Sequence, residues 1–137
     1  NLEEKNREQF INFAYTHLNF KNKKYEVALK YLSKCNSATG MDKINIKTYE
    51  FYLYYELGYR EELINLADTS RHYIKYDKTM SNAELKLFSN FVSAVTMLSE
   101  YRYGLKNIKE NEYELEKIKN FISENINCYH RCYNSRK

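Results

Sequence analysis

The sequence predicts an all-α protein, and three observations carry that prediction. The chain of 137 residues has no proline and only three glycines, so few residues are available to interrupt helices. Apolar residues recur at the three- and four-residue spacing of amphipathic helices. Ala28 and Leu63, at the start of two successive second helices, lie 35 residues apart, close to the period of stacked helical hairpins. We therefore expect an α-solenoid of about six antiparallel helices, paired into hairpins.

The first hairpin is expected to combine helices over residues 2–20 and 25–35, joined by the polar turn 21–24. Apolar residues at helical spacing predict the stripe with which each helix faces the core. In the first helix this stripe is Phe10, Ile11, Phe13, Ala14 and Leu18, and in the second it is Tyr25, Ala28, Leu29 and Leu32. The small side chain of Ala28 predicts a close approach of the two helices.

The second hairpin is expected to combine helices over residues 43–57 and 60–76, after a loop at 36–40. The helix 43–57 is apolar on most of its circumference, so we expect it to be the most buried one. Gly58 is expected to end it as a left-handed cap, because glycine adopts positive φ without steric cost. The inward-facing residues of the helix 60–76 are expected to be Leu63, Leu66, Ala67 and Ile74.

The third hairpin is expected to begin at a capping box. The Ser81 hydroxyl and the Glu84 carboxylate can each accept from the other residue's backbone N–H, which starts a helix over residues 82–103 that Gly104 ends. The core face of this helix is expected to be Leu87, Phe88, Phe91, Val95 and Leu98. A sixth helix is expected over 110–127, with the stripe Tyr113, Ile118, Phe121, Ile122 and Ile126.

The length of the chain is typical of a single domain, residues 1–137. Because the sequence opens at Asn1 without an initiator methionine, we expect it to be a piece of a longer protein. Six helices joined by short turns also allow a closed bundle. The regular step from the first hairpin to the second favours the solenoid.

Composition argues against several classes of partner. The net charge is +4, with 22 basic and 18 acidic residues, which is mild for a nucleic-acid-binding domain. The densest basic group, Lys21, Lys23 and Lys24, falls in a predicted turn. No apolar run approaches the roughly 18 residues that a membrane span needs. Nucleic acid and membrane are therefore not the expected partners.

The cysteines and histidines predict neither a metal site nor catalysis. An odd number of cysteines without framework spacing indicates reduced thiols and a cytoplasmic location. Cys128 and Cys132 share a predicted helix with His130, but a structural zinc site needs about four ligands. The other histidines, His17 and His72, lie on separate predicted helices and in no motif. We expect no metal, no cofactor and no enzymatic activity.

With these residues in view, the chain resembles tetratricopeptide repeat (TPR) proteins. Three segments carry the resemblance: Ala14 and Leu18 followed by Tyr25-x-x-Ala28, the run Tyr54-Tyr55-Glu56-Leu57-Gly58, and Asn90-Phe91. The last two are similar to the helical C-terminal part of uncharacterised bacterial TPR-like proteins. The chain departs from the TPR pattern because no Trp-x-x-Leu-Gly opens a repeat, no proline closes one, and Leu63 replaces a small alanine. We therefore describe the expected fold as TPR-like.

The resemblance implies a concave groove lined by the first helix of each repeat. The corresponding positions are Gln9, Asn12, Thr16 and Asn19 in the first repeat and Asn45, Thr48, Tyr52 and Glu56 in the second. The first four also form one polar face of their predicted helix. Asparagine carries both a donor and an acceptor, which suits it to hold the backbone of an extended peptide. Equally, both faces could simply be solvated.

The favoured hypothesis is a non-catalytic protein–protein interaction scaffold that binds a peptide or a partner helix in this groove. One alternative is a helical-repeat nucleic-acid binder, whose tyrosines would stack on bases. Its phosphate contacts would come from Lys21, Lys23, Lys24, Lys106 and Lys109. Another alternative is a structural module that packs against the rest of its own chain, which an exposed apolar face would favour. The sequence identifies neither the partner nor the oligomeric state.

Overall fold

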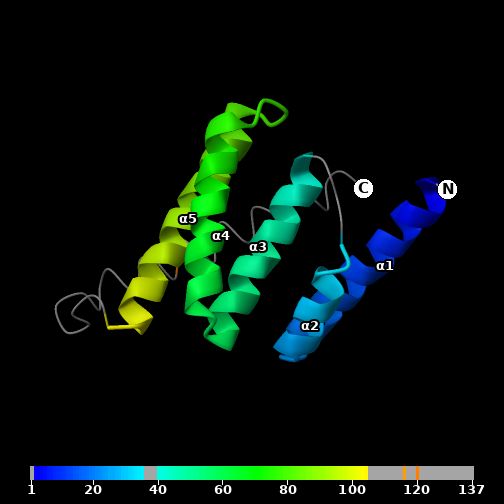
Figure 1. Ribbon diagram of the computed structural model, residues 1–137, viewed down its shortest axis with the longest axis horizontal. Coiled ribbons are helices and arrows are strands. Elements are labelled where there is room, and N and C mark those ends of the chain that lie inside the picture. Colours follow the sequence, from blue (N-terminus) through cyan, green and yellow to red (C-terminus); the bar gives the residue numbers. More distant parts are fainter. Residues whose placement is uncertain (1, 36–39, 105–115, 117–119, 121–137) are drawn as a thin grey trace. The chain divides into compact units, whose positions relative to one another are not determined.

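The structure, a computed structural model, describes residues 2–35, 40–104, 116 and 120 of the chain. Within these residues it is all-helical, as predicted (Figure 1). The helices are α1 (Leu2–Lys21), α2 (Tyr25–Leu32), α3 (Gly40–Leu57), α4 (Arg60–Tyr76) and α5 (Asn82–Arg102). Each of these bounds lies within three residues of the predicted one. The sixth predicted helix, 110–127, lies outside the described residues, apart from Glu116 and Asn120.

The chain divides into two compact units, and each is described by itself. Unit 1 comprises Asn1–Leu66 and Lys78–Met80, and unit 2 comprises Ala67–Asp77 and Ser81–Lys137. Unit 1 therefore contains α1, α2, α3 and the first turns of α4. Unit 2 contains the rest of α4 and all of α5.

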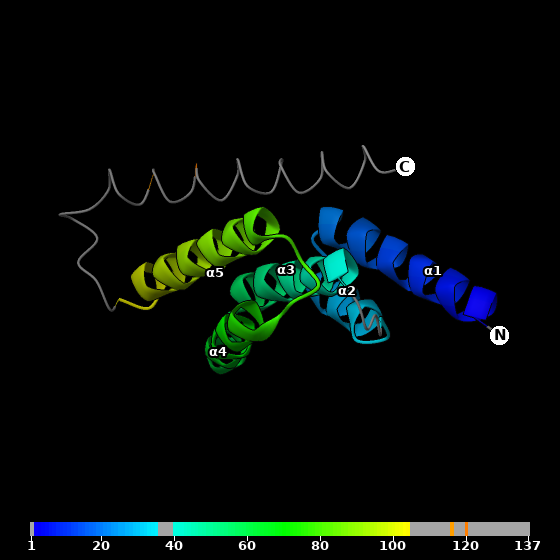
Figure 2. The same cartoon turned by 90° about the horizontal axis from the view of Figure 1, so that it is seen from above.

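In unit 1, α2 packs against both α1 and α3 (Figures 1 and 2). The centre of this packing is a buried cluster of Ala28 and Leu32 from α2 with Tyr49 and Leu53 from α3. Ala28 is 0% exposed, which confirms its predicted place in the core. Its methyl side chain leaves room for the helices on either side to approach α2 closely.

The turns that end α1 and α3 have the same geometry. Lys23 and Gly58 both adopt left-handed φ values, 59° and 76°. After each helix, one backbone N–H reaches back five residues, from Lys24 to the Asn19 oxygen at 2.8 Å and from Tyr59 to the Tyr54 oxygen at 2.9 Å. This is the Schellman arrangement, in which the last helical carbonyls are satisfied by the turn itself. The predicted role of Gly58 as a left-handed cap is confirmed.

The predicted core stripe of α1 is wrong. Four of its residues are exposed: Phe10 (59%), Ile11 (45%), Leu18 (53%) and Ala14. Phe13 is the one member that turns inward, where its ring contacts Tyr49 of α3. Thr16 occupies the buried centre of the helix instead and is 0% exposed. The helix carries apolar residues on two sides, and the aromatic contacts with α3 decide which side is buried.

In unit 2, α5 begins at the predicted capping box. The Glu84 backbone N–H donates to the Ser81 hydroxyl and the Ser81 N–H donates to the Glu84 carboxylate, both at 3.2 Å. Phe88, Phe91 and Val95 are buried as predicted. The predicted neighbours Leu87 and Leu98 are only partly buried.

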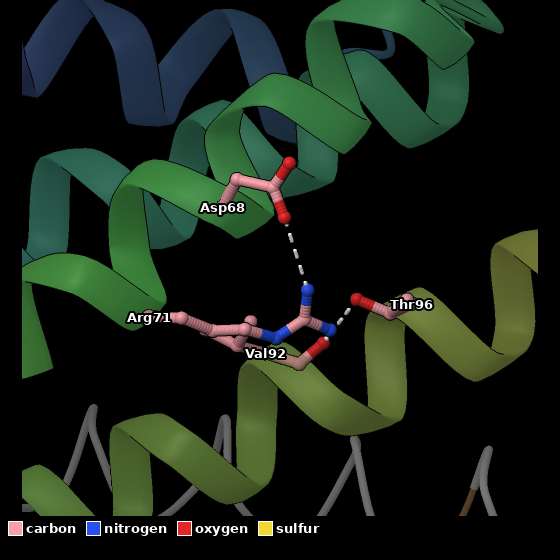
Figure 3. Close-up of polar contacts among 4 residues, drawn as sticks. All are labelled: Asp68, Arg71, Val92 and Thr96. Atoms are coloured by element: carbon pink, nitrogen blue, oxygen red, sulfur yellow. Dashed lines mark hydrogen bonds and ion pairs between the residues drawn. The ribbon is translucent and has the colours of Figure 1, made fainter.

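Most of the residues predicted to face inward on α4 are buried. Leu63 and Leu66 in unit 1 and Ala67 in unit 2 are buried, and Ile74 is partly buried. In unit 2, Arg71 of α4 forms an ion pair with Asp68 at 3.3 Å (Figure 3). The same view shows a hydrogen bond within α5, in which the Thr96 hydroxyl donates to the Val92 carbonyl oxygen at 2.7 Å. Among the described helices, none combines the length and the apolar character that crossing a membrane requires.

Candidate functional site

Tyr49 of α3 connects α1 to α3 within unit 1. Its ring meets the edges of two α1 rings, Phe13 at 5.3 Å and Phe20 at 5.7 Å between centroids. The Tyr49 hydroxyl and Nδ1 of His17 form a hydrogen bond. Phe20 also lies 5.7 Å from the ring of Tyr52, one turn further along α3. The two contacts of Tyr49 are edge-to-face, a favoured geometry of aromatic pairs, and they fix which side of α1 faces α3.

The four groove residues predicted on α1 lie on its packed side and differ in what they offer to a ligand. Thr16 is buried, and its hydroxyl donates to the Asn12 carbonyl oxygen at 2.8 Å. The Asn19 side chain donates to the Tyr15 carbonyl oxygen at 2.8 Å. The amides of Gln9 and Asn12 are partly exposed and form no hydrogen bond with any described residue. Gln9 and Asn12 therefore keep free amides, whereas the hydroxyl of Thr16 is enclosed.

The four residues predicted on α3 divide in a similar way. Thr48 is 8% exposed, and its hydroxyl donates to the Ile44 carbonyl oxygen at 2.8 Å. The Asn45 amide is partly exposed and has no hydrogen-bond partner in the described part of the chain. Tyr52 is partly buried against Phe20, and Glu56 is exposed. Asn45 and Glu56 therefore keep accessible polar groups, whereas Tyr52 is only partly exposed and its hydroxyl is buried.

The structure brings accessible residues of the two helices to one aromatic contact. Asn12 directly precedes Phe13, and Asn45 lies one turn before Tyr49. Because the Phe13 and Tyr49 rings touch, the two asparagines flank the same contact. We refer to Gln9, Asn12, Asn45, Tyr52 and Glu56 as the candidate face.

Charge at one end of the candidate face affects a neighbouring tyrosine. The pKa of Tyr25 is raised, first by burial and second by the negative charge of Glu56. Tyr25 opens α2, and its ring lies 5.7 Å from that of Phe20. Glu56 and burial therefore act in the same direction on Tyr25, whose hydroxyl is the neutral donor form at physiological pH in any case.

The sequence interpretation missed a second polar stripe, which lies on a different side of α3. Lys47, Glu50 and Tyr54 follow one another at helical spacing and are all partly buried. Burial lowers the pKa of Lys47, with Glu50 opposing that shift, and burial raises the pKa of Glu50, with Lys47 opposing. The pKa of Tyr54 is raised by burial and by the charges of Glu50 and Glu62. The spacing i, i+3, i+7 was the available signal, but it was hidden among apolar residues.

Basic and metal-ligating residues are placed as follows. Lys21, Lys23 and Lys24 are exposed around the turn between α1 and α2, whereas Lys106 and Lys109 lie outside the described residues.

The thiol pKa of Cys35 is raised by burial. Cys128, His130 and Cys132 also lie outside the described residues. Within residues 2–35, 40–104, 116 and 120, no three His, Cys, Asp or Glu side chains gather closely enough to hold a metal ion.

Comparisons of the chain with protein-family models, with curated proteins and with solved structures found no match. The function must therefore be argued from the residues of the chain itself.

Proposed function

We propose that this chain is a TPR-like helical-repeat protein that acts as a non-catalytic, cytoplasmic interaction scaffold. Its candidate face would bind an extended peptide or a partner helix. The observation that supports the proposal most directly is the pair Asn12 and Asn45, which flank one aromatic contact with amides that no described residue engages. A peptide backbone presents donors and acceptors that match these amides.

The aromatic contacts preorganise the candidate face. Phe13, Phe20 and Tyr49 hold α1 against α3, so the two helices that carry the amides are already fixed against each other before a ligand binds. Preorganisation of this kind reduces the entropic cost of binding. Tyr52 lies two turns beyond Asn45 on α3 and adds a partly exposed ring, and Glu56 adds a negative charge that favours a peptide with a basic residue at that end.

The test is direct binding of selected peptides. A displayed peptide library is panned on the complete chain, and the affinities of the selected peptides are measured by isothermal titration calorimetry. The double variant N12A/N45A removes both amides, and N90A serves as the matched control because Asn90 is an exposed asparagine of α5. Losing two hydrogen bonds worth roughly 1 kcal/mol each predicts a loss of affinity of about tenfold or more.

The outcomes separate the proposed function from its alternatives. Unchanged affinity of the double variant, or an equal loss in N90A, would contradict the candidate face. Capture of nucleic acid from lysate that is abolished by nuclease and falls steeply with salt would favour the nucleic-acid alternative. Failure to select any peptide would leave the structural-module alternative as the better account.

A further inference from the structure

The side of α1 opposite to the buried Thr16 is unusually apolar. Its large side chains are each about half exposed: Phe10 (59%), Ile11 (45%), Tyr15 (46%) and Leu18 (53%). Ala14 lies among them and is exposed as well. At about 100° per residue these five positions cover roughly 140° of the helix, opposite to Thr16. We call Phe10, Ile11, Ala14, Tyr15 and Leu18 the α1 outer face.

This surface is too large to be a scatter of single apolar residues. At these exposed fractions the two aromatic side chains alone leave roughly 100 Å² each in contact with water. The whole face then falls within the range of about 300–600 Å² that is typical of the largest apolar patch on a monomer, a patch that is often functional. One flank of it is also fixed in place, because the Tyr15 ring stacks on Tyr31 of α2 at 5.1 Å.

Three residues of the α1 outer face, Ile11, Ala14 and Leu18, belong to a longer line of side chains with the spacing of a coiled-coil seam. Intervals of three and four residues alternate along Glu4, Arg7, Ile11, Ala14, Leu18 and Lys21. Such alternation keeps one line of side chains facing a partner helix. The middle of the seam is apolar, and its two ends, Glu4 and Lys21, are exposed and oppositely charged.

The seam is complementary to a reversed copy of itself. In an antiparallel pair of α1 helices, Glu4 lies opposite Lys21 at both ends of the seam. Ile11 then lies opposite Ala14, so that a large side chain meets a small one and the helices can approach closely. Arg7 lies opposite Leu18, where its aliphatic stem covers the leucine.

A parallel pair would not have this complementarity. It would place Glu4 against Glu4 and Lys21 against Lys21, which is repulsive at both ends. The pattern of charge therefore selects the antiparallel arrangement, which is also the one that a twofold axis generates. We infer that a second copy of this chain docks on the α1 outer face, forming a symmetric antiparallel homodimer through α1.

The size of the contact sets the expected strength of this dimer. Helix α1 has 20 residues and is therefore about 30 Å long. A single pair of such helices buries less than the roughly 1,200–2,000 Å² of a standard stable interface. We expect dissociation in the micromolar range and dimers that form and separate readily.

Charge reversal tests both the dimer and its direction, using sedimentation velocity of the complete chain at low salt. E4K and K21E each create repulsion at both ends of an antiparallel seam, so each is expected to weaken association at least fivefold. The double variant E4K/K21E restores both ion pairs, and so does an equimolar mixture of the two single variants. K86E is the matched control, because Lys86 is an exposed lysine of α5. Circular dichroism checks that each variant keeps its helix content.

Three results would overturn the inference. The first is a wild-type chain that stays monomeric up to about millimolar concentration. The second is single variants that associate as tightly as the wild type, which is the expectation for a parallel pair. The third is a double variant that fails to recover association. In N12A/N45A, Asn12 lies outside the α1 outer face and Asn45 lies on α3, so this variant is expected to leave sedimentation unchanged. Failure of this inference is therefore distinguishable from failure of the proposed peptide site.

Discussion

Two leucine-to-alanine substitutions are expected to differ widely in their effect on stability, and together they test how α1 is oriented. Leu53 of α3 is 0% exposed and packs with Ala28, Leu32 and Tyr49 in the core of unit 1. Removing its side chain leaves a cavity, so L53A is expected to lower the free energy of unfolding by about 3 kcal/mol. Leu18 is 53% exposed on the α1 outer face, so L18A is expected to change the free energy of unfolding by less than about 0.5 kcal/mol.

The assay is urea unfolding followed by circular dichroism, at a protein concentration low enough to keep the chain monomeric. The midpoint of L53A should fall with little change in the denaturant slope, which would show that the amount of surface exposed on unfolding is preserved. The midpoint of L18A should stay close to that of the wild type. A loss in L18A as large as that in L53A would refute the orientation of α1, because it would put Leu18 in the core as its sequence pattern suggests.

Three further predictions concern local features. G58A forces an alanine into the left-handed turn after α3, where φ is 76°. The substitution should lower the free energy of unfolding by about 1–2 kcal/mol in urea titration. An unchanged unfolding midpoint would show that alanine fits the turn without strain. Ser70 is 0% exposed, and its hydroxyl has no hydrogen-bond partner among the described residues. S70A should therefore raise the free energy of unfolding by about 1 kcal/mol. A lower free energy of unfolding in S70A would indicate that the hydroxyl is hydrogen-bonded. Burial raises the pKa of Glu50 in the folded chain. The protonated Glu50 side chain therefore favours folding at low pH, and this stabilisation is lost as the pH rises through the folded-state pKa. E50Q should therefore unfold at a higher temperature than the wild type at neutral pH, with the difference disappearing in acid, and a constant difference across the pH range would exclude this cause.

Helix bounds and caps were predictable because they depend on neighbouring residues. Gly58 ends α3 because it alone can take the left-handed turn without steric cost, and that property is visible in the sequence. Ser81 and Glu84 stand three residues apart, and their reciprocal hydrogen bonds need nothing from the rest of the chain. Helix α4 has the bounds that its pattern predicts.

The orientation of α1 could not be predicted in this way. Phe10 and Leu18 define one apolar side, and Phe13 and Phe20 define another, so the pattern allows either side to be buried. Contacts with Tyr49, which lies on a different helix, decide the outcome. Thr16 can be buried there because its hydroxyl is satisfied by the carbonyl of Asn12 in its own helix.

The same uncertainty limited the prediction of the candidate site. Sequence spacing placed Thr16 and Thr48 with Asn12 and Asn45 on shared helix faces. Whether each of these side chains reaches solvent depends on how closely the helices pack, which the spacing does not encode. The peptide groove stays a prediction, now narrowed to the residues of the candidate face.

The most direct test of the central proposal is nuclear magnetic resonance of the labelled chain during titration with a selected peptide. Side-chain NH₂ groups give resolved signals, so the amides of Gln9, Asn12 and Asn45 report binding individually. We predict that these signals shift together and saturate with the peptide, while that of Asn90 stays unchanged. Shifts confined to the α1 outer face or to unit 2, with Asn12 and Asn45 unaffected, would contradict the account.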